Sequence, residues 1–143
     1  MPKTDNEEFK TIYRLPYSAD ASACAKMLNK YYDVKKDGEI VDVVTLTEPY
    51  NVIKSYAFDS CHVKELTLPD TVTRLNRYAF IDCKTLKKIT LGKGIEKCGE
   101  DIILRSSVQE IVWTKPIGED IDDALSSLLY GLIREESTIF YRT

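Results

Sequence analysis

One side chain dominates any search for catalytic chemistry, because His62 is the only histidine of the chain. It follows Cys61 directly, and a thiol beside an imidazole is the pairing that cysteine nucleophiles use. A Ser–His–acid triad would need the same histidine. We expect Cys61 to point into the core and His62 to lie at a surface corner, so no catalytic residue is predicted. An enzyme with an unrecognised site stays an alternative.

Metal and phosphate chemistry also lack a convincing pattern. The turn Gly92-Lys93-Gly94 has neither the length nor the Lys-Ser pair of a phosphate loop. The cysteines lie too far apart in sequence for a zinc site, and no second histidine accompanies them. These cysteines are Cys24, Cys61, Cys83 and Cys98. The sequence therefore predicts no phosphate loop and no zinc site.

An acidic cluster near the C-terminus has two interpretations, a metal site or the first turn of a helix. The cluster comprises Glu119, Asp120, Asp122 and Asp123. It lacks the glycine and the alternating ligand spacing of a calcium loop. Negative charge is favoured at a helix N-terminus, so we adopt the helix interpretation and expect no metal and no cofactor.

The composition is that of an ordinary folded domain. The chain has 143 residues, of which 43% are hydrophobic and 30% charged, and its net charge is −3. This mild charge gives no reason to expect nucleic acid or an anionic membrane as a partner. No apolar run approaches the ~20 residues of a membrane span, and the polar N-terminus does not resemble a signal peptide. We expect a cytoplasmic protein, or an extracellular or surface protein if a signal peptide has been removed.

A repeat organises the middle of the chain. The segment Ser55–Cys61 (SYAFDSC) returns 22 residues later as Arg77–Cys83 (RYAFIDC). Ile53 precedes the first copy and Leu75 precedes the second. A fixed period of about 20–30 residues is the mark of a solenoid, in which each coil stacks on the next.

Each coil carries one short stretch in which apolar and polar residues alternate. These stretches are Val44-Thr45-Leu46, Leu66-Thr67-Leu68, Ile89-Thr90-Leu91 and Ile111-Val112-Trp113. Alternation with a period of two predicts strands that point their first and third residues inward. Stacking one strand per coil makes a parallel sheet. Its outward face would carry two columns of side chains, Val43-Glu65-Lys88-Glu110 and Thr45-Thr67-Thr90-Val112.

The repeated cysteines occupy core positions in this scheme. Cys61 and Cys83 are equivalent, and Cys98 falls where Ile53 and Leu75 stand in earlier coils. A position that accepts Ile, Leu or Cys requires a small apolar filler, and a buried free cysteine behaves as one. We expect reduced thiols, which suit an intracellular compartment.

Turn residues end each strand, and a Tyr-Ala-Phe segment follows on the opposite side of the coil. We expect this segment to form one short helical turn, with Phe58 stacked on Phe80. In the third coil, Asp101-Ile102-Ile103-Leu104 replaces the motif and loses the aromatic ring.

The combination of Ser-Tyr-Ala-Phe-x-x-Cys with Leu-x-Leu-Pro resembles the BspA-like leucine-rich repeat family. Residues 53–91 match its pattern best, and a weaker likeness extends over about residues 39–143. Lys115-Pro116-Ile117-Gly118 and Thr138-Ile139-Phe140-Tyr141 are similar to the pieces that end chains of this family. The resemblance implies a leucine-rich repeat solenoid that binds other proteins.

The two ends of a solenoid must differ from its middle, because exposed ends would leave the core open. Residues 9–13 alternate like a strand, and residues 18–32 are amphipathic with Ser18 as N-cap. At the other end, residues 118–133 carry an apolar stripe. Its members are Ile121, Leu125, Leu128, Leu129 and Leu132.

The predicted fold is thus an α/β solenoid: a short leucine-rich repeat with a parallel sheet. A strand–helix cap precedes it and a helix–strand cap follows it. We expect one domain over 1–143, divided into a cap at 1–38, coils at 39–114 and a cap at 115–143.

Two surfaces are candidate binding sites. The first is the outward face of the sheet, with Glu65, Thr67, Lys88, Thr90 and Glu110. Alternating charges and stacked threonines would also simply stabilise the sheet. The second is a flank where Tyr56 and Tyr78 recur one coil apart and are expected to stack. Further tyrosines considered for this flank are Tyr31, Tyr32 and Tyr50.

The predicted function is that of a non-catalytic module that binds another protein, without a cofactor and most simply as a monomer. The alternative is a structural subunit of a larger viral or cell-surface assembly. A solenoid usually presents a surface rather than a reaction centre, which favours the first interpretation over an enzyme.

Overall fold

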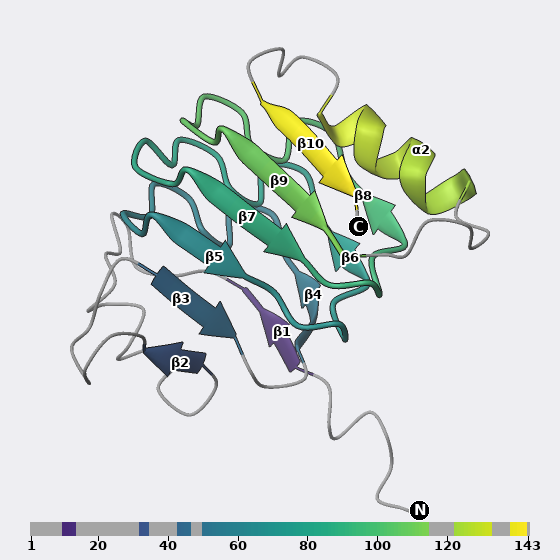
Figure 1. The fold of residues 1–143 in the computed structure, drawn as a ribbon, viewed down its shortest axis with the longest axis horizontal. Coiled ribbons are helices and arrows are strands. Elements are labelled where there is room, and N and C mark those ends of the chain that lie inside the picture. Colours follow the sequence, from purple (N-terminus) through teal and green to yellow (C-terminus); the bar gives the residue numbers. More distant parts are fainter. Residues whose placement is uncertain are drawn as a thin grey trace, which may run out of the picture.

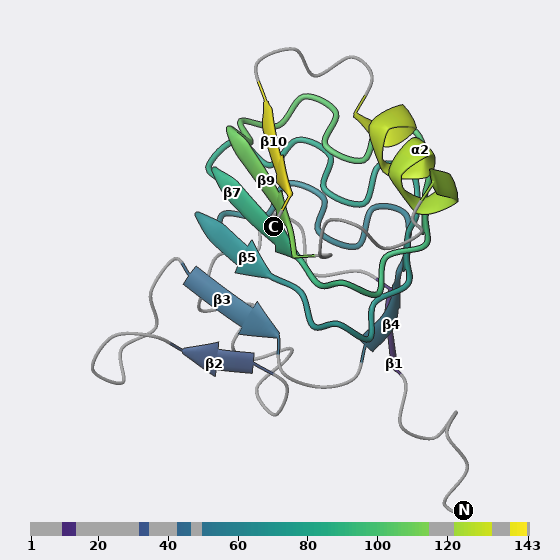
Figure 2. The ribbon, with the colours of Figure 1, turned by 45° about the vertical axis from the view of Figure 1, so that its right-hand side comes forward.

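The computed structural model describes residues 10–13, 32–34, 43–46, 50–114, 122–132 and 138–142. Within them, coils of chain stack between two sheets, as Figures 1 and 2 show. The larger sheet has six strands among the described residues, and all neighbours are parallel except β2 and β3. In spatial order they are β10 (Ile139–Arg142), β9 (Glu110–Trp113), β7 (Lys88–Leu91), β5 (Glu65–Thr67), β3 (Val43–Leu46) and β2 (Tyr32–Val34).

The register of the larger sheet confirms the predicted alignment of the coils. Glu65 pairs with Lys88, and Lys88 pairs with Glu110. Thr67 pairs with Thr90 in the neighbouring column. The residues that lie between these columns and directly after the second one are buried, because side chains alternate between the two faces of a strand. They are Leu66, Leu68, Ile89, Leu91, Ile111 and Trp113.

A second sheet of very short strands lies on the opposite side of the coils, and the sequence did not predict it. Its strands in spatial order are β1 (Lys10–Ile12), β4 (Tyr50–Ile53), β6 (Arg74–Leu75) and β8 (Lys97–Cys98). Ile53, Leu75 and Cys98 stand in register, as the repeat predicted. Strands of two residues contribute one inward side chain each, so no alternation was visible.

The segment between β4 and β5 forms a run of overlapping tight turns, and the predicted helical turn is wrong. Lys54 O accepts from Ala57 N at 3.1 Å, and Phe58 O accepts from Cys61 N at 3.1 Å. The φ angle is 64° at Tyr56, which a helix cannot accommodate. The physical reason is that Phe58 N donates to Ala79 O of the next coil at 2.9 Å. Backbone N–H groups such as that of Phe58, which a helix would bond within the same segment, thus donate to the next coil instead.

Stacked aromatic rings fill the core beneath these turns. Phe58 and Phe80 are fully buried, with ring centroids 5.2 Å apart and planes 20° from parallel, which confirms their predicted stacking. The third coil keeps the turn geometry without the ring, because φ is 53° at Asp101 and 57° at Arg105. Two buried isoleucines, Ile102 and Ile103, occupy the core there.

The three cysteines among the described residues, Cys61, Cys83 and Cys98, lie in the core as free thiols. Cys61 and Cys83 place their Sγ atoms 3.4 Å apart, and both are buried. The thiol contact with Cys61, together with burial, raises the pKa of Cys83. Burial raises the pKa of Cys98 to about 12. Cys24 lies outside the described residues.

The N-terminal predictions are covered only in part. Within the predicted strand at 9–13, β1 pairs in parallel with β4. The predicted helix at 18–32 lies outside the described residues except for its last position. There the prediction is wrong, because Tyr32 begins β2, which pairs antiparallel with β3.

At the other end, the described part of the predicted helix at 118–133 is α2 (Asp122–Gly131), which packs beside β8 (Figure 1). Leu128 is buried, and the neighbouring Leu125 and Leu132 are half-buried. Leu129 is 47% exposed, so its assignment to the apolar stripe is wrong. One helix residue turns the side chain by about 100°, which carries it past the contact line.

The acidic cluster is covered in part as well. Asp122 and Asp123 lie in the first turn of α2, whereas Glu119, Asp120 and Ile121 lie outside the described residues. After α2, strand β10 returns beside β9 in parallel (Figure 2). Among the described residues, no helix has the length and apolarity that a bilayer crossing requires.

Candidate functional site

The outward face of the larger sheet brings together the residues predicted as the first candidate surface, which we call the strip: Glu65, Thr67, Lys88, Thr90 and Glu110. Glu65 is exposed, while Lys88 and Glu110 are half-buried in the same column. Thr67 and Thr90 are half-buried in the adjacent column. Each of these side chains has a partner of the next strand directly beside it. The strip is therefore a mixed, regularly paired polar surface.

The predicted tyrosine flank also forms, with a different ring geometry. The rings of Tyr56 and Tyr78 have centroids 5.5 Å apart but planes tilted by 50°, so they are in contact without being stacked. Tyr56 is 40% exposed and Tyr78 is half-buried. Both stand at the left-handed position of the first tight turn, with φ of 64° and 62°. That equivalence directs both rings to the same side of the solenoid.

The other tyrosines considered for this flank do not join it in the described structure. Tyr50 is only 3% exposed and belongs to the core, so its prediction as a surface residue is wrong. It opens β4, where the first strand position faces inward. Tyr31 lies outside the described residues, and the side chain of Tyr32 is not described.

An arginine that the sequence analysis missed orients this flank. The Arg77 guanidinium lies 4.5 Å from the centre of the Tyr78 ring, and its Nη2 donates to the Tyr78 hydroxyl at 2.7 Å. The hydrogen bond with Tyr78 raises the pKa of Arg77. The same Nη2 lies 3.6 Å from Oε1 of Glu100 in the next coil. Arg77 therefore links the ring of its own coil to a carboxylate of the following one.

A groove of about 370 Å³ opens beside this arginine. Tyr130 of α2, which is 53% exposed, donates its hydroxyl to Glu100 at 3.3 Å across the groove. The lining residues are Ser55, Asn76, Arg77, Gly99, Glu100 and Tyr130. We call the surface formed by Tyr56, Tyr78 and this groove the tyrosine flank.

Close backbone approach explains the glycines below the groove. A Cβ on Gly99 would lie 2.4 Å from Arg77 N, and one on Gly131 would lie 2.7 Å from Gly99 O. Neither position tolerates a side chain without a shift of the backbone. The two glycines therefore let the third coil and the end of α2 pack tightly enough to shape the groove.

No local sequence pattern pointed to this groove. Arg77, Glu100 and Tyr130 are separated by 23 and 30 positions. Arg77 and Glu100 are equivalent in successive coils, as are Tyr56, Tyr78 and Asp101. Aligning the turns of successive coils, as was done for the strands, would have placed Arg77 beside Glu100. The docking of α2, and with it Tyr130, could not be read that way.

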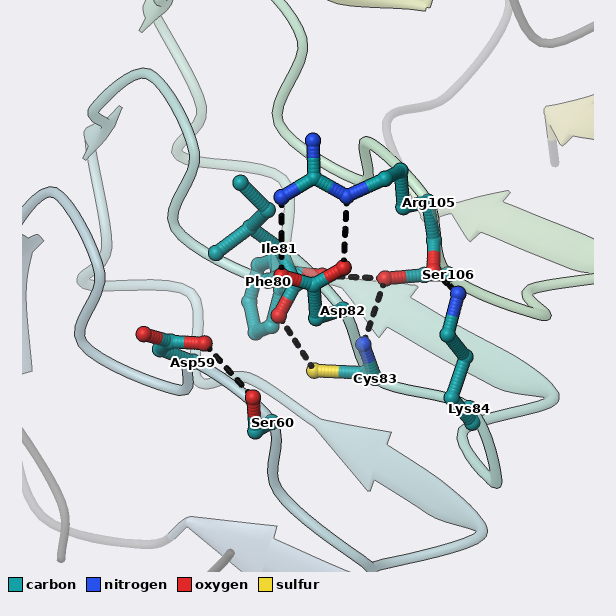
Figure 3. A network of polar contacts seen from close by, with 9 residues as sticks. All are labelled: Asp59, Ser60, Phe80, Ile81, Asp82, Cys83, Lys84, Arg105 and Ser106. Atoms are coloured by element: carbon teal, nitrogen blue, oxygen red, sulfur yellow. Dashed lines mark hydrogen bonds and ion pairs between the residues drawn. The ribbon is translucent and has the colours of Figure 1, made fainter. Parts of the chain in front are cut away.

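A second arginine on the same side of the coils, Arg105, stabilises the contact between two coils (Figure 3). Arg105 donates from Nε and Nη2 to the two carboxylate oxygens of Asp82, at 2.8 Å and 3.0 Å. These bonds lower the pKa of Asp82. Below them, Ser106 Oγ accepts from Cys83 N at 2.8 Å and donates to Phe80 O. The network ties the second coil to the third.

The fold separates the side chains of Cys61 and His62, the pair that could have carried out cysteine chemistry. Cys61 is fully buried, whereas His62 is exposed, as predicted. Within the described part of the chain, no group of three or more His, Cys, Asp or Glu side chains could hold a metal ion. The tyrosine flank therefore offers an aromatic and charged surface for contacts with another molecule.

Comparison with known proteins agrees with the repeat. The family model described as the BspA type leucine rich repeat region matches residues 41–127 with six copies, which is more than half of the chain. Neither the search of curated proteins nor that of solved structures finds a significant match. The stacked parallel coils and the matched repeats together show that the chain belongs to the BspA-type leucine-rich repeat family.

Proposed function

We propose that this chain is a non-catalytic module that binds another protein through the tyrosine flank. The observation that carries the proposal is the aromatic groove between the turns and α2. The Tyr78 ring contacts the exposed Tyr56 on one side and the Arg77 guanidinium on the other. The exposed Tyr130 lines the groove beside Arg77. Leucine-rich repeats typically mediate protein interactions, and a solenoid presents surfaces by construction.

The residue types of the flank support this choice over the strip. Tyr and Arg are enriched in protein interfaces and among the few residues that dominate binding energy, whereas Lys, Glu and Thr are not. A tyrosine also brings a large contact area with few rotatable bonds. The strip, with Glu65, Lys88 and Glu110, offers paired charges that already have neighbours.

We propose further that the chain acts as one domain over 1–143 and as a monomer, with its two ends as caps. The contact of α2 with the last coil supports a C-terminal cap. Ser127 Oγ accepts from Cys98 N at 2.7 Å and donates to Cys98 O at 3.1 Å, which satisfies the edge of β8. A molar mass in solution equal to that of one chain is expected; a stable oligomer would favour a structural subunit.

A cytoplasmic location is part of the proposal. It is supported by Cys61 and Cys83, whose adjacent thiols are buried as core fillers. Thiol titration of the purified protein under denaturing, non-reducing conditions is expected to find four free groups. Two free groups would argue for an oxidising compartment instead.

The experiment that tests the binding site starts from partners that co-purify with the chain from its native host. The double variant Tyr56→Ser, Tyr78→Ser is then compared with the wild type against the purified partner. We expect about a tenfold or greater loss of affinity, because truncating a hot-spot tyrosine costs 1–2 kcal/mol or more. Undiminished affinity would remove the flank as the site.

A matched control separates this effect from a general loss of exposed apolar area. Ile139 is 55% exposed and lies on β10, in the sheet opposite the turns. The variant Ile139→Ser should bind the partner like the wild type. Thermal unfolding of both variants checks that the double substitution leaves the coils folded.

A further inference from the structure

We infer that the groove of the tyrosine flank takes up a carboxylate of the partner protein, which Arg77 binds in exchange for Glu100. The inference rests on the proposed function and adds the chemistry of the contact: an acidic residue, flanked by an apolar or aromatic side chain. Four observations support it. They are the unused hydrogen-bond donors of the Arg77 guanidinium, its fixed orientation, its long ion pair with Glu100, and the shape of the groove.

The first observation is the difference between two arginines on the same side of the coils. Their side chains are similarly exposed, 53% for Arg77 and 59% for Arg105. Arg105 donates hydrogen bonds to both carboxylate oxygens of Asp82, at 2.8 Å and 3.0 Å. Arg77 donates one hydrogen bond within the described part of the chain, to the Tyr78 hydroxyl. Its remaining donors are left for a ligand.

The second observation is that Arg77 is already oriented. The Tyr78 ring lies 4.5 Å from the guanidinium carbon, and the hydrogen bond to its hydroxyl fixes the rotation of the group. A planar guanidinium presents its donors as a fork that matches a carboxylate. A fork that is held in place loses less conformational freedom on binding, so more of the contact energy appears as affinity.

The third observation concerns Glu100. Its Oε1 lies 3.6 Å from Arg77 Nη2. This distance is short enough for an ion pair but too long for a hydrogen bond. Both side chains are well exposed, so water and salt screen the attraction and the pair contributes little. Glu100 is held in addition by the Tyr130 hydroxyl at 3.3 Å. The carboxylate can therefore give up Arg77 at small cost, but while it stays it repels an incoming acid.

The fourth observation is the wall of the groove. Its lining combines the Tyr130 ring with the Ser55 hydroxyl and the Asn76 amide. The Tyr130 ring at one side offers a surface on which an apolar or aromatic side chain can lie. The volume of about 370 Å³ suits one or two side chains of a peptide, and it is too small for an element of a folded domain.

The test uses short peptides as probes and the full chain as the receptor. One probe is a capped peptide, acetyl-Gly-Leu-Glu-Phe-Gly-amide, and its matched control carries Gln in place of Glu. A third probe ends in a free carboxylate, acetyl-Gly-Gly-Leu-Phe, which separates a side-chain acid from a chain end. Backbone amide shifts in the nitrogen–proton spectrum of the chain report the site.

We expect saturable shifts at Ser55, Asn76 and Gly99 with the Glu probe, and weaker binding of both the Gln control and the chain-end probe. The variant Arg77→Gln should weaken binding about tenfold, because a charge-assisted hydrogen bond is lost. The variant Arg105→Gln, with its guanidinium committed to Asp82, should leave probe affinity unchanged. The variant Glu100→Gln should tighten binding about two- to fivefold, since the competing charge is removed.

Opposite signs for Arg77→Gln and Glu100→Gln distinguish this mechanism from a general weakening of the flank. No saturable shift with the Glu probe, even if the chain-end probe binds, would overturn the inference. Equal losses in Arg77→Gln and Arg105→Gln, or a loss in Glu100→Gln, would overturn it as well. Failure here is distinguishable from failure of the proposed function. If Tyr56→Ser, Tyr78→Ser loses the native partner while Arg77→Gln retains it, the flank binds but not through a carboxylate.

Discussion

Two of the ways in which the coils meet their neighbours differ sharply, namely the layer of strands in the larger sheet and the layer of turns. In the strand layer, β5, β7 and β9 repeat a regular ladder, and each outward side chain has a partner beside it. In the turn layer, residues 54–61, 76–83 and 99–106 join through rings, single backbone bonds and a bidentate ion pair. The period of 22 or 23 residues is common to both layers.

This difference indicates where each layer can vary. A ladder uses its backbone groups uniformly, so its outward positions tolerate any polar side chain that suits its neighbours. In the turn layer, Tyr56 and Tyr78 have φ above 60°, which is uncommon for bulky residues. Such a conformation persists only where the surrounding packing determines it. Of these two strained tyrosines, Tyr56 is exposed and Tyr78 is half-buried beside Arg77, and this is why we place the binding site there.

The largest expected effect comes from removing the ring that joins the turns. Phe80 is fully buried and stacks on Phe58 at 5.2 Å. The variant Phe80→Ala should lower the free energy of unfolding by about 3–5 kcal/mol, because transfer and cavity terms add. Urea denaturation followed by circular dichroism measures it.

A neighbouring substitution provides the control for that measurement. Ile81 is buried in the same turn but loses only one methylene in Ile81→Val, which should cost about 0.5–1.5 kcal/mol. An unfolding midpoint of Phe80→Ala equal to that of Ile81→Val would contradict the ring-stacking account of the turn layer.

The next effect concerns how the two sides of the coils end. The strand layer continues into β10, whereas the short-strand sheet ends on α2. There the Ser127 hydroxyl takes the place of a further strand and bonds both Cys98 N and Cys98 O. The variant Ser127→Ala should cost about 1–3 kcal/mol, because two backbone groups lose their partner at a half-buried edge.

The adjacent serine makes this prediction specific. Ser126 lies on the exposed side of the same helix turn, so Ser126→Ala should leave stability within about 0.5 kcal/mol of the wild type. Hydrogen exchange at Cys98 N should accelerate in Ser127→Ala alone. Equal exchange in both variants would show that the hydroxyl does not hold the edge.

The two layers also differ in how far the sequence predicts them. In the strand layer, the alternation around Leu66, Ile89 and Ile111 identified the strands, their register and both outward columns. That success has a simple cause, since period-2 alternation and a fixed repeat length leave one alignment. In the turn layer, the aromatic stacking was predicted, but the helical turn was not found.

The reason is that the turns depend on bonds between coils. Phe58 N and Phe80 N each donate to a carbonyl one coil away, at 2.9 Å and 2.8 Å, and such bonds leave no local pattern. Tyrosine at a left-handed position is also rare enough that no propensity points to it. For the site, Tyr56 and Tyr78 followed from the repeat. Arg77 and Tyr130 required the packing of a coil against a helix that is distant in sequence.

The smallest expected effect tests whether the strand layer is only structural. Lys88 lies between Glu65 and Glu110, so Lys88→Glu would place three acids in one column. Like charges directly opposite each other destabilise a sheet by about 0.2–1 kcal/mol per pair. We expect a loss near the low end, because these side chains are at least partly solvated, and recovery of the loss in high salt.

Binding of the native partner by the same variant then decides between the two surfaces. If the partner sits on the turn layer, the folded Lys88→Glu protein should retain its affinity, while Tyr56→Ser, Tyr78→Ser loses it. If Lys88→Glu abolishes binding with the fold intact, the contact lies on the strip. The comparison between the layers would then reverse, because a column that pairs well within the sheet would also be the column that recognises the partner. The strained tyrosines would be left with a purely structural role in joining the coils.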